Sequence, residues 1–222
     1  MIETPSPNFN DRPRDTPIDM LVVHYTGMES AGAALERLCD PTFEVSAHYL
    51  IDEDGTLHRL VREAHRAWHA GVAAWRGHTD INGRSIGVEL VNPGHEFGYR
   101  PFPIAQMAAF RDLAKSILGR HPIPARNVVG HSDVAPSRKT DPGELFDWQG
   151  LAADGIGFWP PPLTASAMTE TEAAQILNRY GYENSDPAAA VTAFQRHFHT
   201  DIIDGVVDEV TASRILALAD AV

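Results

Sequence analysis

Short apolar runs alternate with helical patterns along this chain. The run Met20–Val23 has the length of a buried strand and ends at His24. Residues 85–91 carry apolar side chains on both faces, which favours the middle of a covered sheet. Residues 103–119 repeat apolar side chains at helical spacing. This interleaving predicts an α/β fold with a central mixed β-sheet flanked by helices.

A β-hairpin is the clearest local signal. Residues 48–51 and 56–61 are both β-prone, and the dipeptide Asp54–Gly55 lies between them. Asp-Gly between two such runs is a strong turn signal, so these residues are predicted to form two antiparallel strands. The other elements expected in this part are an extended lead-in over residues 1–18, a helix over 33–39 and a strand over 127–130.

The pattern changes after a Pro-rich connector over residues 158–163. Thr169 and Glu172 form a capping box at the start of a helix. Asp186–Pro187 opens a second helix, and Asp208 caps a third. This segment is predicted to be a small all-α three-helix domain. The expected domains are residues 1–160 and residues 164–222.

The charge balance excludes some classes of partner. The net charge is −12 with His neutral, which argues against nucleic acid and against an anionic membrane surface. No apolar run reaches the length of a membrane span, so no membrane insertion is expected. The first residues show no secretory signal, which favours a cytoplasmic location; a periplasmic or envelope location is the alternative for a trimmed chain. The sequence leaves the oligomeric state unknown.

The segment Gly130–Gly143 holds the residues most typical of a catalytic site. His131 follows a strand, and a loop fixed by Pro and Gly leads to Asp141, so the two side chains can converge. His24, also at a strand end, is the candidate for a third ligand. Two His and one Asp with an open fourth position are typical of catalytic zinc. The sequence therefore predicts one Zn²⁺ ion held by His24, His131 and Asp141.

Two further residues have chemistry that suits such a site. Zinc brings the pKa of a water towards neutrality and polarises a carbonyl group. Glu89, on a neighbouring strand, is the candidate general base for that water, and Lys139 is the candidate group that stabilises the oxyanion. The alternative interpretations are hydrogen-bonded core histidines, a structural ion pair for Glu89 and a solvated Lys139.

These residues resemble the N-acetylmuramoyl-L-alanine amidases of the type-2 family, which share a fold with bacteriophage T7 lysozyme and the peptidoglycan recognition proteins. The resemblance covers roughly residues 18–150, and the order and spacing of its blocks are specific. The five blocks are Val23–Thr26, Ser46–Ile51, Ala67–Gly71, Asn82–Glu89 and Gly130–Gly143.

The resemblance places the zinc ligands of the family on His24, His131 and Asp141. It places the catalytic acidic residue on Glu89 and the catalytic lysine on Lys139. Phage members have Cys as the third ligand, and the Asp in this chain matches the bacterial enzymes. The resemblance implies hydrolysis of the amide bond between the lactyl group of (anhydro-)N-acetylmuramic acid and L-alanine. The implied partner is peptidoglycan or a muropeptide.

The C-terminal segment resembles a three-helix peptidoglycan-binding domain through Ala193–Arg196, Asp204–Gly205 and Thr211. This pairing of domains resembles the AmiD branch, whose members are envelope lipoproteins. The absence of a lipoprotein signal instead favours a recycling role like that of the AmpD branch, which acts on 1,6-anhydro-muropeptides. The alternatives are an envelope amidase for polymeric peptidoglycan, a recognition protein that binds without cutting, and a zinc peptidase that cuts within the stem peptide.

Other polar residues of the matching blocks are candidates for substrate contact. Trp68 and His69 are expected to line the groove, although Trp68 equally suits the core. Asn82 and Arg84 are candidates for binding a peptide carboxylate. The histidines expected at the surface are His65, His78, His95, His121, His197 and His199.

Overall fold

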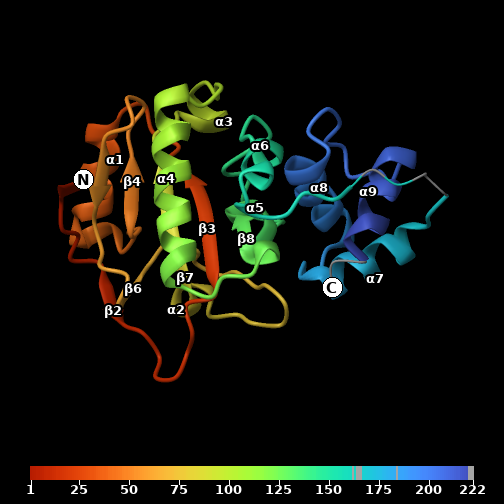
Figure 1. Ribbon diagram of the computed structural model, residues 1–222, viewed down its shortest axis with the longest axis horizontal. Coiled ribbons are helices and arrows are strands. Elements are labelled where there is room, and N and C mark those ends of the chain that lie inside the picture. The colour runs from red at the N-terminus through yellow and green to blue at the C-terminus, as the bar shows by residue number, and fades with distance from the viewer. Residues whose placement is uncertain (162, 164–166, 184, 220–222) are drawn as a thin grey trace.

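A six-stranded mixed sheet is the centre of the first 160 residues (Figure 1). The structure is a computed structural model and describes residues 1–161, 163, 167–183 and 185–219. The middle strands are parallel, and β4 and β5 form the predicted antiparallel hairpin. In spatial order the strands are β1 (Ile2–Glu3), β5 (Leu57–Arg59), β4 (Tyr49–Ile51), β7 (Ser85–Leu90), β3 (Met20–Tyr25) and β8 (Val128–Gly130). The predicted α/β class and mixed sheet are confirmed.

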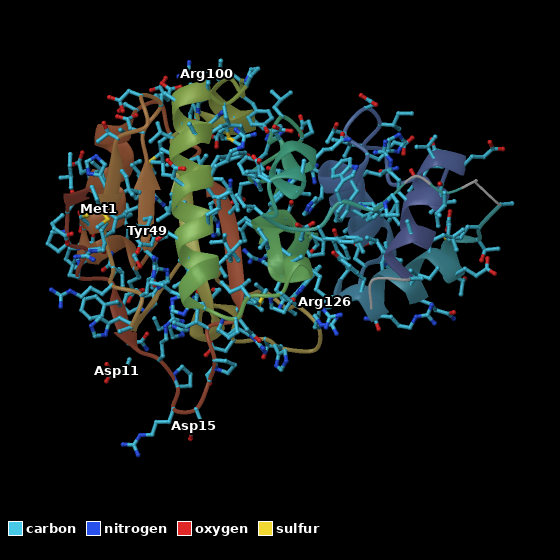
Figure 2. The ribbon with its side chains drawn as sticks, in the orientation of Figure 1. Met1, Asp11, Asp15, Tyr49, Arg100 and Arg126 are labelled. Atoms are coloured by element: carbon cyan, nitrogen blue, oxygen red, sulfur yellow. The ribbon has the colours of Figure 1, made fainter. Side chains whose placement is uncertain are left out.

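The N-terminal lead-in forms two short β-strands that its composition did not predict. β1 adds in parallel to the outer strand of the hairpin. β2 (Phe9–Asp11) pairs antiparallel with β6 (His65–Ala67) in a separate two-stranded sheet. The loop that carries Asp15 then extends away from the sheet before β3 begins (Figure 2). These strands are short and polar, so their partners distant in sequence, rather than an apolar pattern, define them.

The two faces of β3 point into different environments because side chains alternate across a strand. Leu21 and Val23 pack in an apolar cluster with Phe110 of α4 (Ile104–Arg120), which lies along one face of the sheet (Figure 1). Met20 and Val22 point to the opposite face and pack in another cluster. His24 continues this second set along the strand, so the alternation directs its side chain away from α4.

The C-terminal helices pack against the α/β part through an apolar cluster. They are α7 (Glu170–Tyr180), α8 (Pro187–Phe198) and α9 (Glu209–Ala219). Their apolar side chains share the cluster that contains Met20 and Val22. The division at 1–160 and 164–222 remains a prediction. Pro162 of the connector and residues 164–166, 184 and 220–222 of the second segment lie outside the described residues.

The expected starts of the three C-terminal helices are confirmed. The Thr169 hydroxyl accepts a hydrogen bond from the Glu172 amide, and the Glu172 carboxylate accepts one from the Thr169 amide. Asp186 caps α8 and Asp208 accepts from the Thr211 amide at α9. The remaining helical segments are α1 (Ala31–Cys39), α2 (Ile81–Arg84), α3 (Gly94–Phe97), α5 (His131–Val134), α6 (Trp148–Ala153) and the 3₁₀ turns Pro41–Phe43 and Ala125–Asn127.

Across the described ranges, the helices are all too short or too polar to cross a lipid bilayer.

Candidate metal centre and substrate groove

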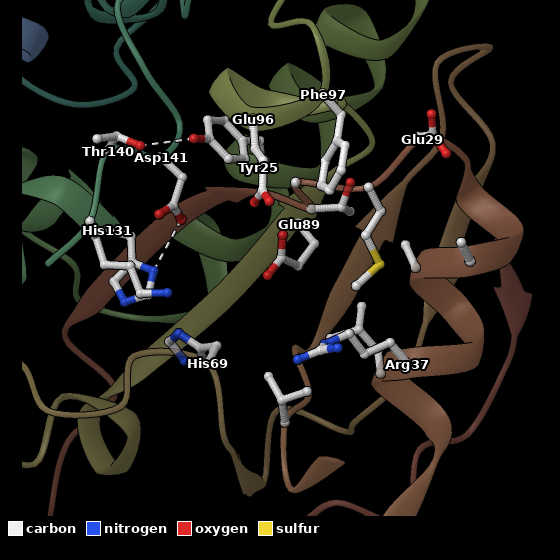
Figure 3. Close-up of a pocket in the computed structure, with 18 of the residues that line it drawn as sticks. Tyr25, Glu29, Arg37, His69, Glu89, Glu96, Phe97, His131, Thr140 and Asp141 are labelled. Carbon is white, nitrogen blue, oxygen red and sulfur yellow. Dashed lines mark hydrogen bonds and ion pairs between the residues drawn. The ribbon is translucent and has the colours of Figure 1, made fainter.

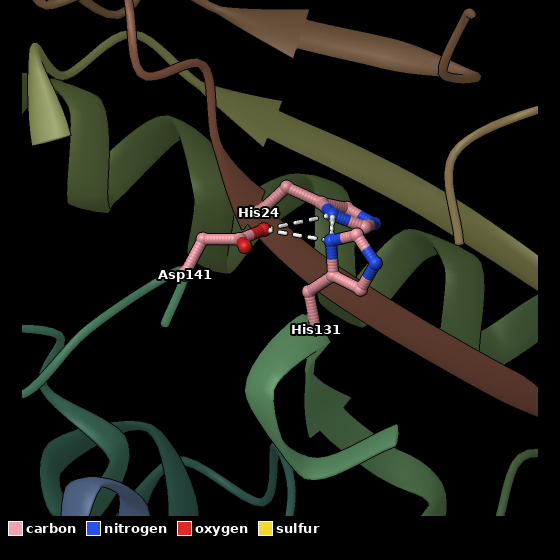
Figure 4. Close-up of side chains that lie close together, drawn as sticks. All are labelled: His24, His131 and Asp141. Carbon is pink, nitrogen blue, oxygen red and sulfur yellow. Dashed lines mark hydrogen bonds and ion pairs between the residues drawn. The ribbon is translucent and has the colours of Figure 1, made fainter. Parts of the chain in front are cut away.

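Three buried side chains that are distant in the sequence converge on one point (Figure 4). His24 comes from β3, His131 begins α5 directly after β8, and Asp141 lies in the loop that follows. The His24 and His131 Nδ1 atoms are 3.0 Å apart, and each is 3.0 Å from Asp141 Oδ2. β8 pairs with β3, so the topology of the sheet brings the two histidines together.

The tautomer of His131 follows from its outer hydrogen bond. Its Nε2 lies 3.0 Å from the backbone carbonyl oxygen of Ala70, which can only accept. Nε2 therefore carries the proton, and the Nδ1 lone pair points towards Asp141. Such an outer bond orients a metal-ligating imidazole.

A longer chain of hydrogen bonds defines the tautomer of His24. The Ser85 hydroxyl donates to the carbonyl of Ile81 over 2.6 Å, so it accepts from His69 Nε2 over 3.1 Å. The other nitrogen of His69 then accepts from His24 Nε2 over 3.0 Å. The Nδ1 lone pair of His24 is therefore also directed at the point of convergence.

The charges of this cluster suit a cation. Burial, followed by the charge of His131, lowers the pKa of His24 to about 4. Burial alone raises the pKa of Asp141, but the two histidines outweigh it and hold that pKa well below its usual value. The lone pairs directed by the outer hydrogen bonds of the two histidines thus face the carboxylate, an arrangement that a bound cation stabilises.

The donor set fits zinc. Ligand atoms at about 2.0–2.2 Å from a tetrahedral zinc lie about 3.3–3.6 Å from one another. The observed separations of 3.0 Å are slightly shorter, so a small outward movement of the side chains accommodates the ion. His24, His131 and Asp141 are the residues that could hold it, and the pocket beside them leaves space for a fourth ligand.

Glu89 lies on the strand next to His24. The two residues are paired in the register of β3 and β7, and both side chains point away from α4. Glu89 is buried, and its Oε2 has no hydrogen-bond partner among the described residues. Burial, assisted by the charge of Asp141, raises the pKa of Glu89 well above its usual value. Burying a carboxyl group without a hydrogen-bond partner costs folding free energy, and such groups cluster at functional sites. Glu89 is therefore a candidate for proton transfer.

The groove beside these residues has a volume of about 830 Å³ (Figure 3). Glu89, His131 and Asp141 line it together with Lys139, which is half-buried. The structure thus brings all the residues predicted for metal binding and catalysis to one cavity, with His24 directly behind its wall.

The predicted substrate contacts divide into two groups. His69 lines the groove, although most of its side chain is buried against His24. Trp68 is half-buried and donates from its indole nitrogen to Asn10. Asn82 accepts from the amides of His69 and Ala70, which fixes that loop.

Arg84 forms an ion pair with Asp19 next to the opposite end of β3 from His24. These internal contacts support the packing of the loop and of the strand ends. Contact of Asn82 and Arg84 with a peptide carboxylate stays a prediction.

Gly87 has a packing role that the sequence did not reveal. It lies between Ser85 and Glu89 on the face of β7 that carries the site. A Cβ atom at this position would be 2.4 Å from Cγ of His69. Only glycine therefore lets the His69 ring pack this closely on the strand and reach His24.

Two histidines that were expected at the surface are buried. His199 Nδ1 forms a hydrogen bond of 3.0 Å with the Thr211 hydroxyl. His197 stacks on Trp148 with 3.9 Å between ring centroids and lies 2.7 Å from Asp133. The expectation was wrong because α8 packs against α5, which covers His197, and because His199 lies against α9. The signal for this in the sequence was Asp133, close to the proposed metal ligand His131. A buried carboxylate at that position requires a hydrogen-bond donor, and His197 is one.

The chain matches one family model over residues 14–144, which include every residue of the metal cluster. That family is described as N-acetylmuramoyl-L-alanine amidase. The chain belongs to this amidase family. The amidase AmiD of Escherichia coli K12 is 37% identical over 237 residues, covering 91% of this chain and 83% of that protein. The 1,6-anhydro-N-acetylmuramyl-L-alanine amidase AmpD of Haemophilus influenzae is 35% identical over 162 residues, covering 65% of this chain and 86% of its own length.

Solved structures support the same grouping. E. coli AmiD in complex with the substrate anhydro-N-acetylmuramic acid-L-Ala-D-γ-Glu-L-Lys has a TM-score of 0.84 at 35% identity, covering 96% of this chain and 93% of the other. AmpDh3 of Pseudomonas aeruginosa in complex with anhydromuramic pentapeptide has a TM-score of 0.84 at 32% identity and covers 94% of each chain. The amidase fold is therefore shared over nearly the whole chain, including the C-terminal helices.

Proposed function

We propose that this amidase is zinc-dependent and hydrolyses the bond between the lactyl group of N-acetylmuramic acid and L-alanine in muropeptides. The observation that carries the proposal is the convergence of two imidazole lone pairs and one carboxylate beside an unpartnered buried Glu89. The ligands named for AmiD and AmpDh3 support an anhydro-muropeptide as substrate, because both share this fold at more than 30% identity.

In this proposal His24, His131 and Asp141 hold the ion and leave its fourth position open. When bound, zinc polarises the scissile carbonyl and acidifies water. The carboxylate of Glu89 takes a proton from the attacking water and passes it to the departing nitrogen of L-alanine. The unpartnered Oε2 of Glu89 suits this role, since that oxygen is available to hold the proton between the two transfers. The Lys139 ammonium stabilises the negative charge that develops on the carbonyl oxygen.

We further propose a role in recycling of 1,6-anhydro fragments, with the C-terminal helices as a peptidoglycan-binding element. The AmpD relatives are named for the anhydro substrate. They match only 65% of this chain, and the family model matches residues 14–144, which supports assigning the reaction to the α/β part. Action on polymeric peptidoglycan is the alternative. His69 and Trp68 remain proposed neighbours of the substrate.

The test is digestion of an anhydro-muropeptide and of intact peptidoglycan, with product masses measured before and after chelation of the metal. We expect release of a peptide with free L-alanine at its N-terminus, and loss of this activity with chelator. Glu89→Gln should retain zinc and lose at least about a hundredfold in kcat, because general acid–base catalysis contributes about 10²–10⁴. Binding without cleavage would favour a recognition protein, and cleavage inside the peptide would favour a peptidase.

A further inference from the structure

The groove has a second wall that the proposed chemistry does not use. The residues of the metal cluster lie on one side, and α1 faces them across the cavity (Figure 3). Arg37 comes from the last turn of α1 and points into the groove. This places a long cationic side chain opposite the groups proposed for hydrolysis.

The chain as a whole is acidic, whereas the groove carries charges of both signs. The chain has a net charge of −12, and acidic side chains at the groove include Glu29, Glu96 and Asp141. Such a field repels a substrate that carries carboxylates unless cations face the binding site. A local cation is therefore required wherever an anionic part of the substrate is to be held.

Arg37 is the cation in this groove best placed to bind a ligand. Lys139 lies two residues before Asp141, next to the proposed ion. Arg138 donates to the backbone carbonyls of Val72 and Ala70. For Arg37, by contrast, the described part of the chain supplies no carboxylate within ion-pair distance. Its guanidinium carbon lies 4.5 Å above the ring of Phe43, which orients the group without using its N–H donors.

The peptide named in the AmiD complex carries a matching anion. In L-Ala-D-γ-Glu-L-Lys the chain continues through the side-chain carboxyl of glutamate, so the α-carboxylate of that residue is free. One alanine separates the glutamate from the scissile bond, and successive Cα atoms are about 3.8 Å apart. The free carboxylate therefore lies about 6 Å from the scissile nitrogen, within the same cavity. A guanidinium binds a carboxylate through two parallel hydrogen bonds.

We propose that Arg37 binds the free α-carboxylate of the γ-linked D-glutamate and makes the enzyme selective for the acid over its amide. The inference rests on the proposed amidase function and adds a specificity determinant to it. Arg37 contacts the peptide and not the reacting atoms, so its contribution is made to substrate binding.

The test compares two substrates that differ in one group. One is anhydro-N-acetylmuramic acid-L-Ala-D-γ-Glu-L-Lys, and the other has the glutamate α-carboxylate converted to an amide. For the wild type we expect KM to rise about tenfold on amidation with kcat unchanged, because a charge-assisted hydrogen bond contributes at least about that factor. Arg37→Gln should treat the two substrates alike, with a KM near that of the wild type on the amide. Arg37→Lys should recover part of the preference, since it restores the charge without the planar fork.

Arg62→Gln is the matched control. Arg62 is exposed, lies outside this groove and gives the same change in net charge. It should retain the full preference for the acid. Equal loss on both substrates in Arg37→Gln would overturn the inference, as would a wild type that is indifferent to amidation. Cleavage of neither substrate by the metal-loaded wild type would instead contradict the proposed function itself.

Discussion

Asp133 links the C-terminal helices to the turn that carries His131. Its side chain is 1% exposed and accepts three hydrogen bonds of 2.7 Å. The donors are the Gly130 amide, the Tyr182 hydroxyl and the Nδ1–H of His197. Two of these donors belong to the C-terminal segment, so one carboxylate connects both parts of the chain directly beside a proposed zinc ligand.

Asp133→Ala is expected to lower the free energy of unfolding by about 3–5 kcal/mol. The substitution leaves buried donors without an acceptor, and each such group costs about 1–3 kcal/mol. This is a large part of the roughly 5–15 kcal/mol that keeps a protein folded. Tyr182→Phe removes one of the three bonds and should cost about 1 kcal/mol.

Equilibrium unfolding in urea measures both variants, with the slope checked against the wild type. Asp112→Ala is the control, because Asp112 is exposed on α4 and should change stability by less than about 0.5 kcal/mol. A loss below about 1 kcal/mol in Asp133→Ala would refute the reasoning. It would mean that water or a rearranged neighbour satisfies the donors.

Removal of the metal from the proposed site should destabilise the protein, since the two lone pairs and the carboxylate then face one another; a melting temperature unchanged by chelator would contradict this. Gly87→Ala should cost about 1–3 kcal/mol and weaken zinc affinity, because the new methyl group displaces the His69 ring; a competition assay with a zinc indicator measures the affinity. Burial alone would raise the pKa of Glu63. Hydrogen bonds from Arg120, His121 and Tyr49 outweigh burial and lower this pKa to about 2. This depressed pKa adds stability above about pH 4.5, and that stability is lost as the pH falls towards 2. Glu63→Gln should therefore lower the free energy of unfolding by about 1–2 kcal/mol at pH 7. In a plot of unfolding free energy against pH, the variant should lose less stability than the wild type between about pH 4.5 and 2.

Local patterns were sufficient for most of the secondary structure. The hairpin, the buried strands and the long helix each depend on neighbours within a few residues, as do the helix caps at Thr169 and Asp186. The strands β1 and β2 escaped prediction because their partners lie more than fifty residues away. The burial of His197 escaped for the same reason, since the residues that cover it, Asp133 and Trp148, are distant in the sequence.

The sequence by itself determined the α/β class and the mixed sheet, because these follow from periodicity and turn chemistry. It also indicated the residues of the metal cluster, chiefly through the resemblance of its motif blocks to the amidase family. Only the tertiary structure decided how these residues are supported. It showed the hydrogen-bond chain from Ser85 through His69 to His24, the internal bonds of Arg84 and the position of Arg37 across the groove. Side chains distant in sequence meet through the register of strands and the packing of helices. No local pattern encodes those distances, so the contacts of a side chain can be known only when the chain is folded.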